Sequence, residues 1–82
     1  MPYHKTKIKK GKLGEVSKIE EELAELKDAL KQNNKVMALV ELSDMCGAIS
    51  LYLEKHHPSI NIEDLLVMSK ATASAFRDGT RT

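Results

Sequence analysis

The stretch VMALVELSDMCGAISLYL, residues Val36–Leu53, decides the fold of this chain. At about 100° per residue, its apolar side chains cover nearly the whole circumference of a helix. The pattern therefore predicts a helix buried on most sides. We expect it to run from about residue 35 to residue 56, because Pro58 disfavours helical geometry at His57.

Two amphipathic segments flank this helix. The first, residues 15–32, has apolar residues at alternating steps of three and four, namely Val16, Ile19, Leu23, Leu26 and Leu30. The QNN at residues 32–34 suits a tight connection, so the first two helices should pack antiparallel. Asn61 as N-cap and Gly79 as stop predict a third helix. The expected fold is all-α: an antiparallel helical hairpin plus a third helix, assembling into an oligomeric helical bundle.

The chain is short for a stable monomer. Its 82 residues predict a basic arm over residues 1–14 and one domain over residues 15–82, and a domain of this size buries only about 60% of its unfolded surface. Oligomerisation is therefore expected. The single Cys46 fits a reducing cytosol and is expected as a buried core thiol rather than a nucleophile.

A soluble, cytoplasmic protein is expected. The lysines near the N-terminus precede no apolar signal segment, and two acids interrupt residues 36–53, so neither secretion nor a membrane span is predicted. The arm holds five lysines and no acid. It could contact nucleic acid, but the aromatic residues for base stacking are few, so a solvated, partly disordered tail is the preferred interpretation.

Four carboxylates are expected to converge between the first two helices. Glu41 and Asp44 stand three residues apart in the apolar helix, and Glu22 and Glu25 repeat that spacing in the preceding one. Counted outward from the connection, Glu25 and Glu41 differ in axial level by only about 3 Å. Glu22 falls at the boundary of the apolar stripe, whereas Glu20 and Glu21 are expected to point more toward solvent.

Converging carboxylates repel one another unless a cation lies among them. Hard divalent ions take oxygen ligands, and Mg²⁺ is commonly held by carboxylates together with substrate phosphates. The pattern therefore indicates a metal site suited to hydrolysis of a phosphate anhydride. The structural alternative is that the acids pair with Lys18 or with a lysine of a neighbouring chain.

The motifs EELAEL (Glu21–Leu26) and ELSDM (Glu41–Met45) resemble the E-x-x-E and E-x-x-D signature of the MazG-like all-α nucleoside triphosphate pyrophosphohydrolases. The upstream GKLGEVSKIEEE and the closing FRDGTR resemble compact members, often from phages. The likeness thus spans most of residues 11–81. One departure is Val40, which stands where many members have another Glu.

The resemblance implies a catalytic set of five acids: Glu21, Glu22, Glu25, Glu41 and Asp44. The last four would coordinate Mg²⁺, with Mn²⁺ as an alternative ion, and Glu21 would orient a ligand or water. The implied enzyme cleaves a nucleotide between its α and β phosphates into a monophosphate and pyrophosphate. Helices of two chains in a homodimer or homotetramer would complete each site.

Four basic residues are candidates for binding substrate phosphates: Lys18, Lys70, Arg77 and Arg81. The guanidinium of an arginine can bind a phosphate through two hydrogen bonds. The alternative for each of the four residues is an ordinary solvated charge.

A second functional hypothesis is a non-catalytic helical interaction module of the same fold.

Overall fold

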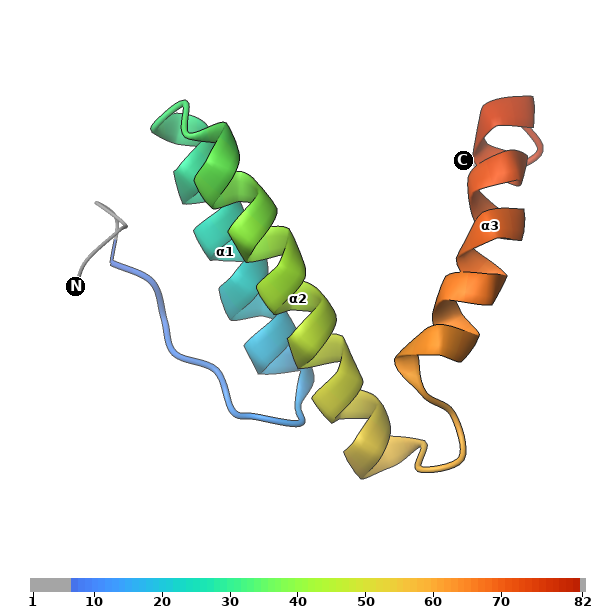
Figure 1. Cartoon of the computed structure of the whole chain (residues 1–82). Coiled ribbons are helices and arrows are strands. Elements are labelled where there is room, and N and C mark those ends of the chain that lie inside the picture. The colour runs from blue at the N-terminus through green and yellow to red at the C-terminus, as the bar shows by residue number, and fades with distance from the viewer. Residues whose placement is uncertain (1–6, 82) are drawn as a thin grey trace.

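A computed structural model describes residues 7–81, and within that range the chain forms three α-helices and no strand (Figure 1). The helices are α1 (Val16–Lys31), α2 (Lys35–His56) and α3 (Ile62–Asp78). The predicted all-helical class is confirmed. Predicted and observed limits of the first helix differ by one residue at each end.

Helices α1 and α2 form an antiparallel hairpin (Figure 1). Polar contacts stabilise both of its ends. At the connection, Asn33 takes a left-handed φ of 56°, and the Asn34 side chain accepts a hydrogen bond of 3.0 Å from the Met37 N–H. At the other end, the Glu15 carboxylate pairs with Lys55. The hydrogen bond from Lys55 lowers the pKa of Glu15. These contacts hold the facing positions of the two helices in register.

Helix α3 stands apart from the hairpin (Figure 1). It begins with a capping box, in which Asn61 and Asp64 exchange hydrogen bonds of 2.9 and 3.0 Å between side chain and backbone. It ends at Gly79, whose φ of 78° is accessible to glycine without strain. None of its residues is buried, so its apolar side chains find little cover within the chain.

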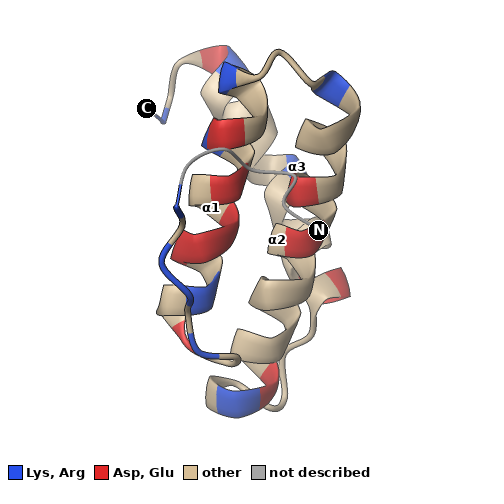
Figure 2. Ribbon diagram, turned by 90° about the vertical axis from the view of Figure 1, so that its left-hand side faces the viewer, with Lys and Arg blue, Asp and Glu red and all other residues tan. Residues whose placement is uncertain are grey.

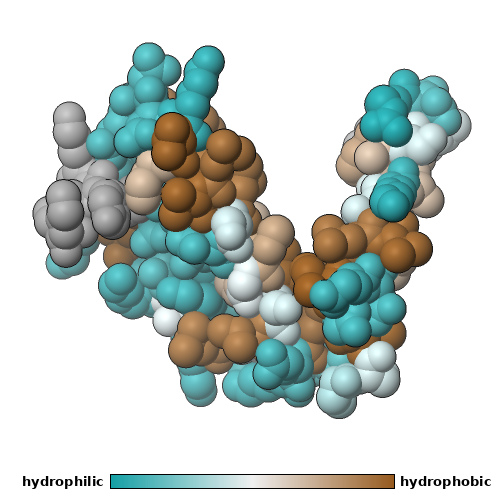
Figure 3. Space-filling model, viewed as in Figure 1, coloured by the Kyte–Doolittle hydropathy of each residue, from teal (hydrophilic) through white to brown (hydrophobic). Residues whose placement is uncertain are grey.

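Much apolar surface of α2 also remains open. Burial within the chain is limited to Ala38, Glu41, Ala48 and Leu53, so the predicted burial on most sides is not reached by one chain. Cys46 is exposed, which corrects the expectation of a core thiol. Brown apolar side chains border the open space between the hairpin and the base of α3 in Figure 3.

The overall dimensions agree with an open shape. The radius of gyration is 14.4 Å, whereas a compact domain of this length has about 12 Å. The accessible surface is 6343 Å², against about 4,900 Å² for a compact monomer of this mass. The chain therefore exposes about 1,400 Å² more than a compact fold would.

Within residues 7–81, α2 is the helix whose length and composition would allow it to cross a membrane. Core helices of soluble proteins pass the same test. Glu41 and Asp44 lie near the middle of this helix, where a bilayer disfavours charge.

The described part of the basic arm, residues 7–14, runs beside α1 (Figure 2). Its lysine side chains are exposed, as expected for a solvated segment. Its backbone, however, is bound to α1, because the Lys12 N–H donates a 3.0 Å hydrogen bond to the Ser17 hydroxyl. This portion of the arm is therefore bound to α1, while its first six residues, where a partly disordered tail was also predicted, lie outside the described range.

Candidate metal centre

The hairpin brings four carboxylates together. Glu22 and Glu25 of α1 and Glu41 and Asp44 of α2 each offer an oxygen, and these oxygens all lie within 4.8 Å of one another. Acidic turns of the two helices lie beside each other in Figure 2. This acidic cluster, as we call these four residues, thus has the arrangement that the paired spacings predicted.

The acidic cluster has a buried end and an open end. Glu22 and Glu41 are 4% and 2% exposed, whereas Asp44 lies at the surface. The buried Oε1 of Glu22 has no hydrogen-bond partner within the described chain, an arrangement that costs free energy. A hard cation would satisfy that atom, and a set of oxygen donors suits Mg²⁺ better than softer ions. The residues present therefore fit such an ion.

The electrostatics of Glu22 reflect this crowding. Burial, followed by the neighbouring carboxyl of Glu25, raises the pKa of Glu22 to about 6. Lys18 acts in the opposite direction, because its Nζ lies 3.4 Å from Glu22 Oε2. Without a metal, Glu22 is thus a group that binds a proton more tightly than an ordinary glutamate.

Lys18 connects the acidic cluster with Glu21. Its Nζ lies 3.2 Å from Glu21 Oε1 as well as 3.4 Å from Glu22 Oε2. Burial opposes the charge on Lys18, but the two carboxylates outweigh burial and raise its pKa. Among the predicted phosphate-binding residues, Lys18 is the one that the structure joins to the acidic cluster.

The prediction that Glu21 points toward solvent is wrong. Glu21 is only 4% exposed, and its Oε1 accepts a 2.8 Å hydrogen bond from the Gly11 N–H. Burial would raise the pKa of Glu21, but this hydrogen bond and Lys18 outweigh it and lower the pKa. Glu21 lies outside the acidic cluster. A helical wheel could not reveal its burial, because the cover comes from the arm.

The remaining predicted phosphate-binding residues belong to the C-terminal part of the chain. Lys70 and Arg77 are exposed on α3, and Arg81 Nη1 donates a 3.3 Å hydrogen bond to Thr72 Oγ1. Because α3 stands apart from the hairpin, one chain does not bring these residues to the acidic cluster.

Sequence reasoning also missed the arm residues that contact Glu21. Lys10 Nζ lies 3.6 Å from Glu21 Oε2, and the Gly11 backbone supplies the hydrogen bond described above. The glycine itself was the available signal, because close backbone approach often requires one.

Comparison with protein-family models, curated proteins and solved structures finds no match for this chain. A function is therefore inferred from the residues themselves.

Proposed function

We propose that this protein is a Mg²⁺-dependent nucleotide pyrophosphohydrolase of the MazG-like superfamily. The observation that carries the proposal is the acidic cluster, in which four carboxylates from two helices lie within 4.8 Å of one another, two of them buried. Buried like charges at this separation are unfavourable without a cation. Such a cluster is therefore more typical of a functional site than of a solvated surface.

In this proposal Glu22, Glu25, Glu41 and Asp44 hold Mg²⁺ or Mn²⁺ through carboxylate oxygens. When bound, such an ion would supply charge neutralisation for the polyphosphate and a more acidic water as the nucleophile for the α phosphorus. Lys18, which already contacts Glu22, offers a positive group to the phosphate oxygens. Water is added across the bond between the α and β phosphates, yielding a nucleoside monophosphate and pyrophosphate.

The active assembly in this proposal is a homodimer or homotetramer in the cytoplasm. The excess of about 1,400 Å² in accessible surface supports it, because a standard interface buries about 800 Å² on each partner. A second copy would cover the apolar face of α2, which in this proposal does not enter a membrane. It would also bring a second α3 near each hairpin, with Lys70, Arg77 and Arg81.

A second candidate function is a non-catalytic helical interaction module. The observation that favours it is the ion pair between Lys18 and Glu22 at 3.4 Å, because an ammonium can offset part of the negative charge without a metal. In that case the acidic cluster would maintain the hairpin, and the exposed apolar faces would bind another chain.

Pyrophosphate release separates the two functions. Wild type is incubated with a panel of ribonucleoside and deoxyribonucleoside triphosphates, with Mg²⁺ and with EDTA. We expect metal-dependent release of pyrophosphate and monophosphate by wild type, and loss of at least about a hundredfold in rate for Glu41→Gln. The matched control is Glu20→Gln, which removes an equal charge from an exposed position of α1. A folded wild type that releases no pyrophosphate from any nucleotide would favour the interaction module.

A further inference from the structure

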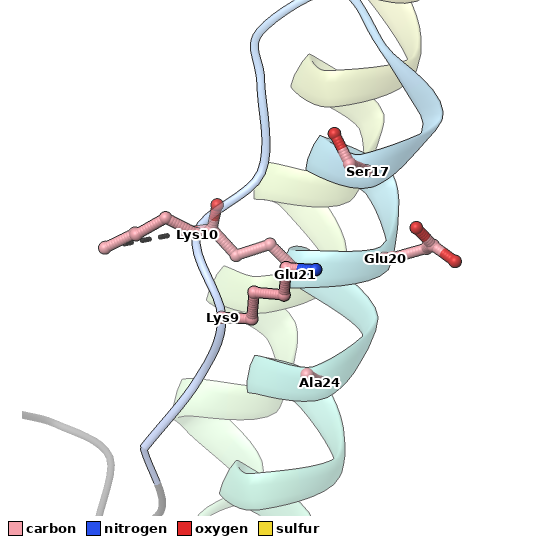
Figure 4. Close-up of a pocket in the computed structure, with 6 residues that line it drawn as sticks. All are labelled: Lys9, Lys10, Ser17, Glu20, Glu21 and Ala24. Carbon is pink, nitrogen blue, oxygen red and sulfur yellow. Dashed lines mark ion pairs between the residues drawn. The ribbon is translucent and has the colours of Figure 1, made fainter.

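A continuous set of contacts leads from the arm to the acidic cluster. It passes from the backbone of Gly11 to Glu21, from Glu21 to Lys18, and from Lys18 to Glu22. Figure 4 shows Glu21 directed toward the arm, with Glu20 directed away from it. Two adjacent glutamates of one helix thus have opposite environments.

The arm is held against α1 at a fixed level. The Lys12 N–H binds the Ser17 hydroxyl at 3.0 Å, and the Glu15 N–H binds the Lys12 carbonyl at 3.0 Å. Gly11 lies so close to α1 that a Cβ there would collide with the backbone of Ser17 and Lys18. The absence of a side chain at position 11 therefore permits the hydrogen bond to Glu21.

The Glu21 carboxylate joins the arm to Lys18. Its Oε1 accepts from both the Gly11 N–H at 2.8 Å and Lys18 Nζ at 3.2 Å. A carboxylate bound by a backbone donor loses much of its rotational freedom, so the group it binds in turn is also fixed. Lys18, with Glu21 on one side and Glu22 on the other, is consequently held at the edge of the acidic cluster.

We propose that Glu21 is a positioning residue, through which the arm holds the Lys18 ammonium beside Glu22 and limits its competition with a metal ion. Because Glu21 shares the ammonium, Lys18 does not pair with Glu22 alone, and Glu22 keeps an oxygen for the ion. The effect on metal binding rests on the proposed function, whereas the fixing of Lys18 does not.

Binding of Mn²⁺ alone, followed by electron paramagnetic resonance, tests the effect on the metal. Glu21→Gln should weaken Mn²⁺ binding about tenfold, because the Lys18 ammonium is then no longer held by Glu21 and can move to the Glu22 oxygen that the ion needs. Glu20→Gln changes the net charge equally and should leave the affinity within about twofold. In a Lys18→Met background, Glu21→Gln should have no further effect. If Glu21→Gln lowers the Mn²⁺ affinity equally with Lys18 and with Lys18→Met, the proposal that Glu21 acts through Lys18 is overturned.

Amine labelling tests the fixing of Lys18 without any metal. The acetylation rate of each lysine is measured by mass spectrometry in EDTA. Glu21→Gln and Gly11→Ala should raise the rate at Lys18 several-fold, with Lys31 unchanged as the internal reference. Should Gly11→Ala fail to fold, Ser17→Ala replaces it, since it removes the acceptor of the Lys12 N–H. An unchanged rate at Lys18 in folded Glu21→Gln overturns the inference.

The two experiments fail in different ways. A wild type that binds no Mn²⁺ contradicts the proposed function, and faster labelling of Lys18 in Glu21→Gln still supports the positioning role. If wild type binds Mn²⁺ but Glu21→Gln has the same Lys18 labelling rate and the same Mn²⁺ affinity as wild type, only the positioning role is contradicted.

Discussion

Glu22 of α1 and Glu41 of α2 place carboxylate oxygens within 4.8 Å of each other although the side chains are only 4% and 2% exposed. Two unit charges at that distance repel by about 3.5 kcal/mol at an effective dielectric constant of about 20. A proton, an ammonium or a metal ion must offset this repulsion. The stability of the hairpin should therefore depend on the cations available to these two residues and on the proton that Glu22 binds.

Millimolar Mg²⁺ should raise the melting temperature of wild type. An ion that binds only the folded state at ten times its dissociation constant adds about 1.4 kcal/mol, or about 6–11 °C for a domain of this size. Calorimetry with and without Mg²⁺ measures the shift. The double variant Glu41→Gln/Asp44→Asn should show no shift beyond that caused by NaCl of equal ionic strength. An equal shift in both proteins would indicate a general salt effect.

The raised pKa of Glu22 predicts how stability of the metal-free protein depends on pH. Its folded pKa of about 6 lies above the ordinary value of 4.5, so its contribution to stability is present below pH 4.5 and is lost as the pH rises through 6. Relative to Glu22→Gln, wild type should lose up to about 2 kcal/mol between pH 4.5 and 7.5. Urea denaturation in EDTA at both pH values measures the difference.

Two results would contradict this pH prediction. One is a constant stability difference between wild type and Glu22→Gln across the range, since Glu22 would then titrate alike in the folded and unfolded states. The other is an equally large change with pH in the stability difference between wild type and Glu20→Gln. Glu20 is exposed, so its substitution should leave the titration of Glu22 in place in both proteins.

The positions of the three helices could be predicted because local signals define their ends. Asn61 caps α3 and Gly79 ends it, while the connection between α1 and α2 is set by Asn33 and Asn34. The spacing of the acids then follows from helical geometry and the antiparallel hairpin. The acidic cluster was accessible to sequence reasoning for this reason.

The environment of Glu21 could not be predicted in the same way. Its burial depends on the arm, which has no helical period and contacts α1 through backbone groups of Gly11 and Lys12. The burial of α2 could not be predicted from one chain either. Apolar side chains around most of α2 show how much of the helix must be covered, but within the hairpin α1 covers only one side of it.

Self-association should account for the exposed apolar side chains. Leu39 of α2 is 67% exposed and Val67 of α3 is 69% exposed, and a second copy that covers such positions gains about 25 cal/mol per Å² of apolar area. We expect wild type to sediment as a dimer or tetramer, and Leu39→Asp to shift it toward the monomer. Lys31→Gln is the surface control. A wild type that stays monomeric at high concentration would contradict the predicted assembly.

Loss of the capping box should loosen α3 without unfolding the hairpin. The Asn61 side-chain oxygen accepts a hydrogen bond from the Asp64 N–H, and the Asn61 N–H donates to the Asp64 carboxylate in return. Removal of such a cap costs about 1 kcal/mol. Because α3 contacts the hairpin little, Asn61→Ala should speed amide hydrogen exchange about fivefold in the first turns of α3, while the amides of α1 keep wild-type rates. Ser59→Ala, at an exposed position before the cap, is the matched control. Equal acceleration in α1 and α3 would show that the helices unfold as one unit, so that the cap stabilises the whole domain.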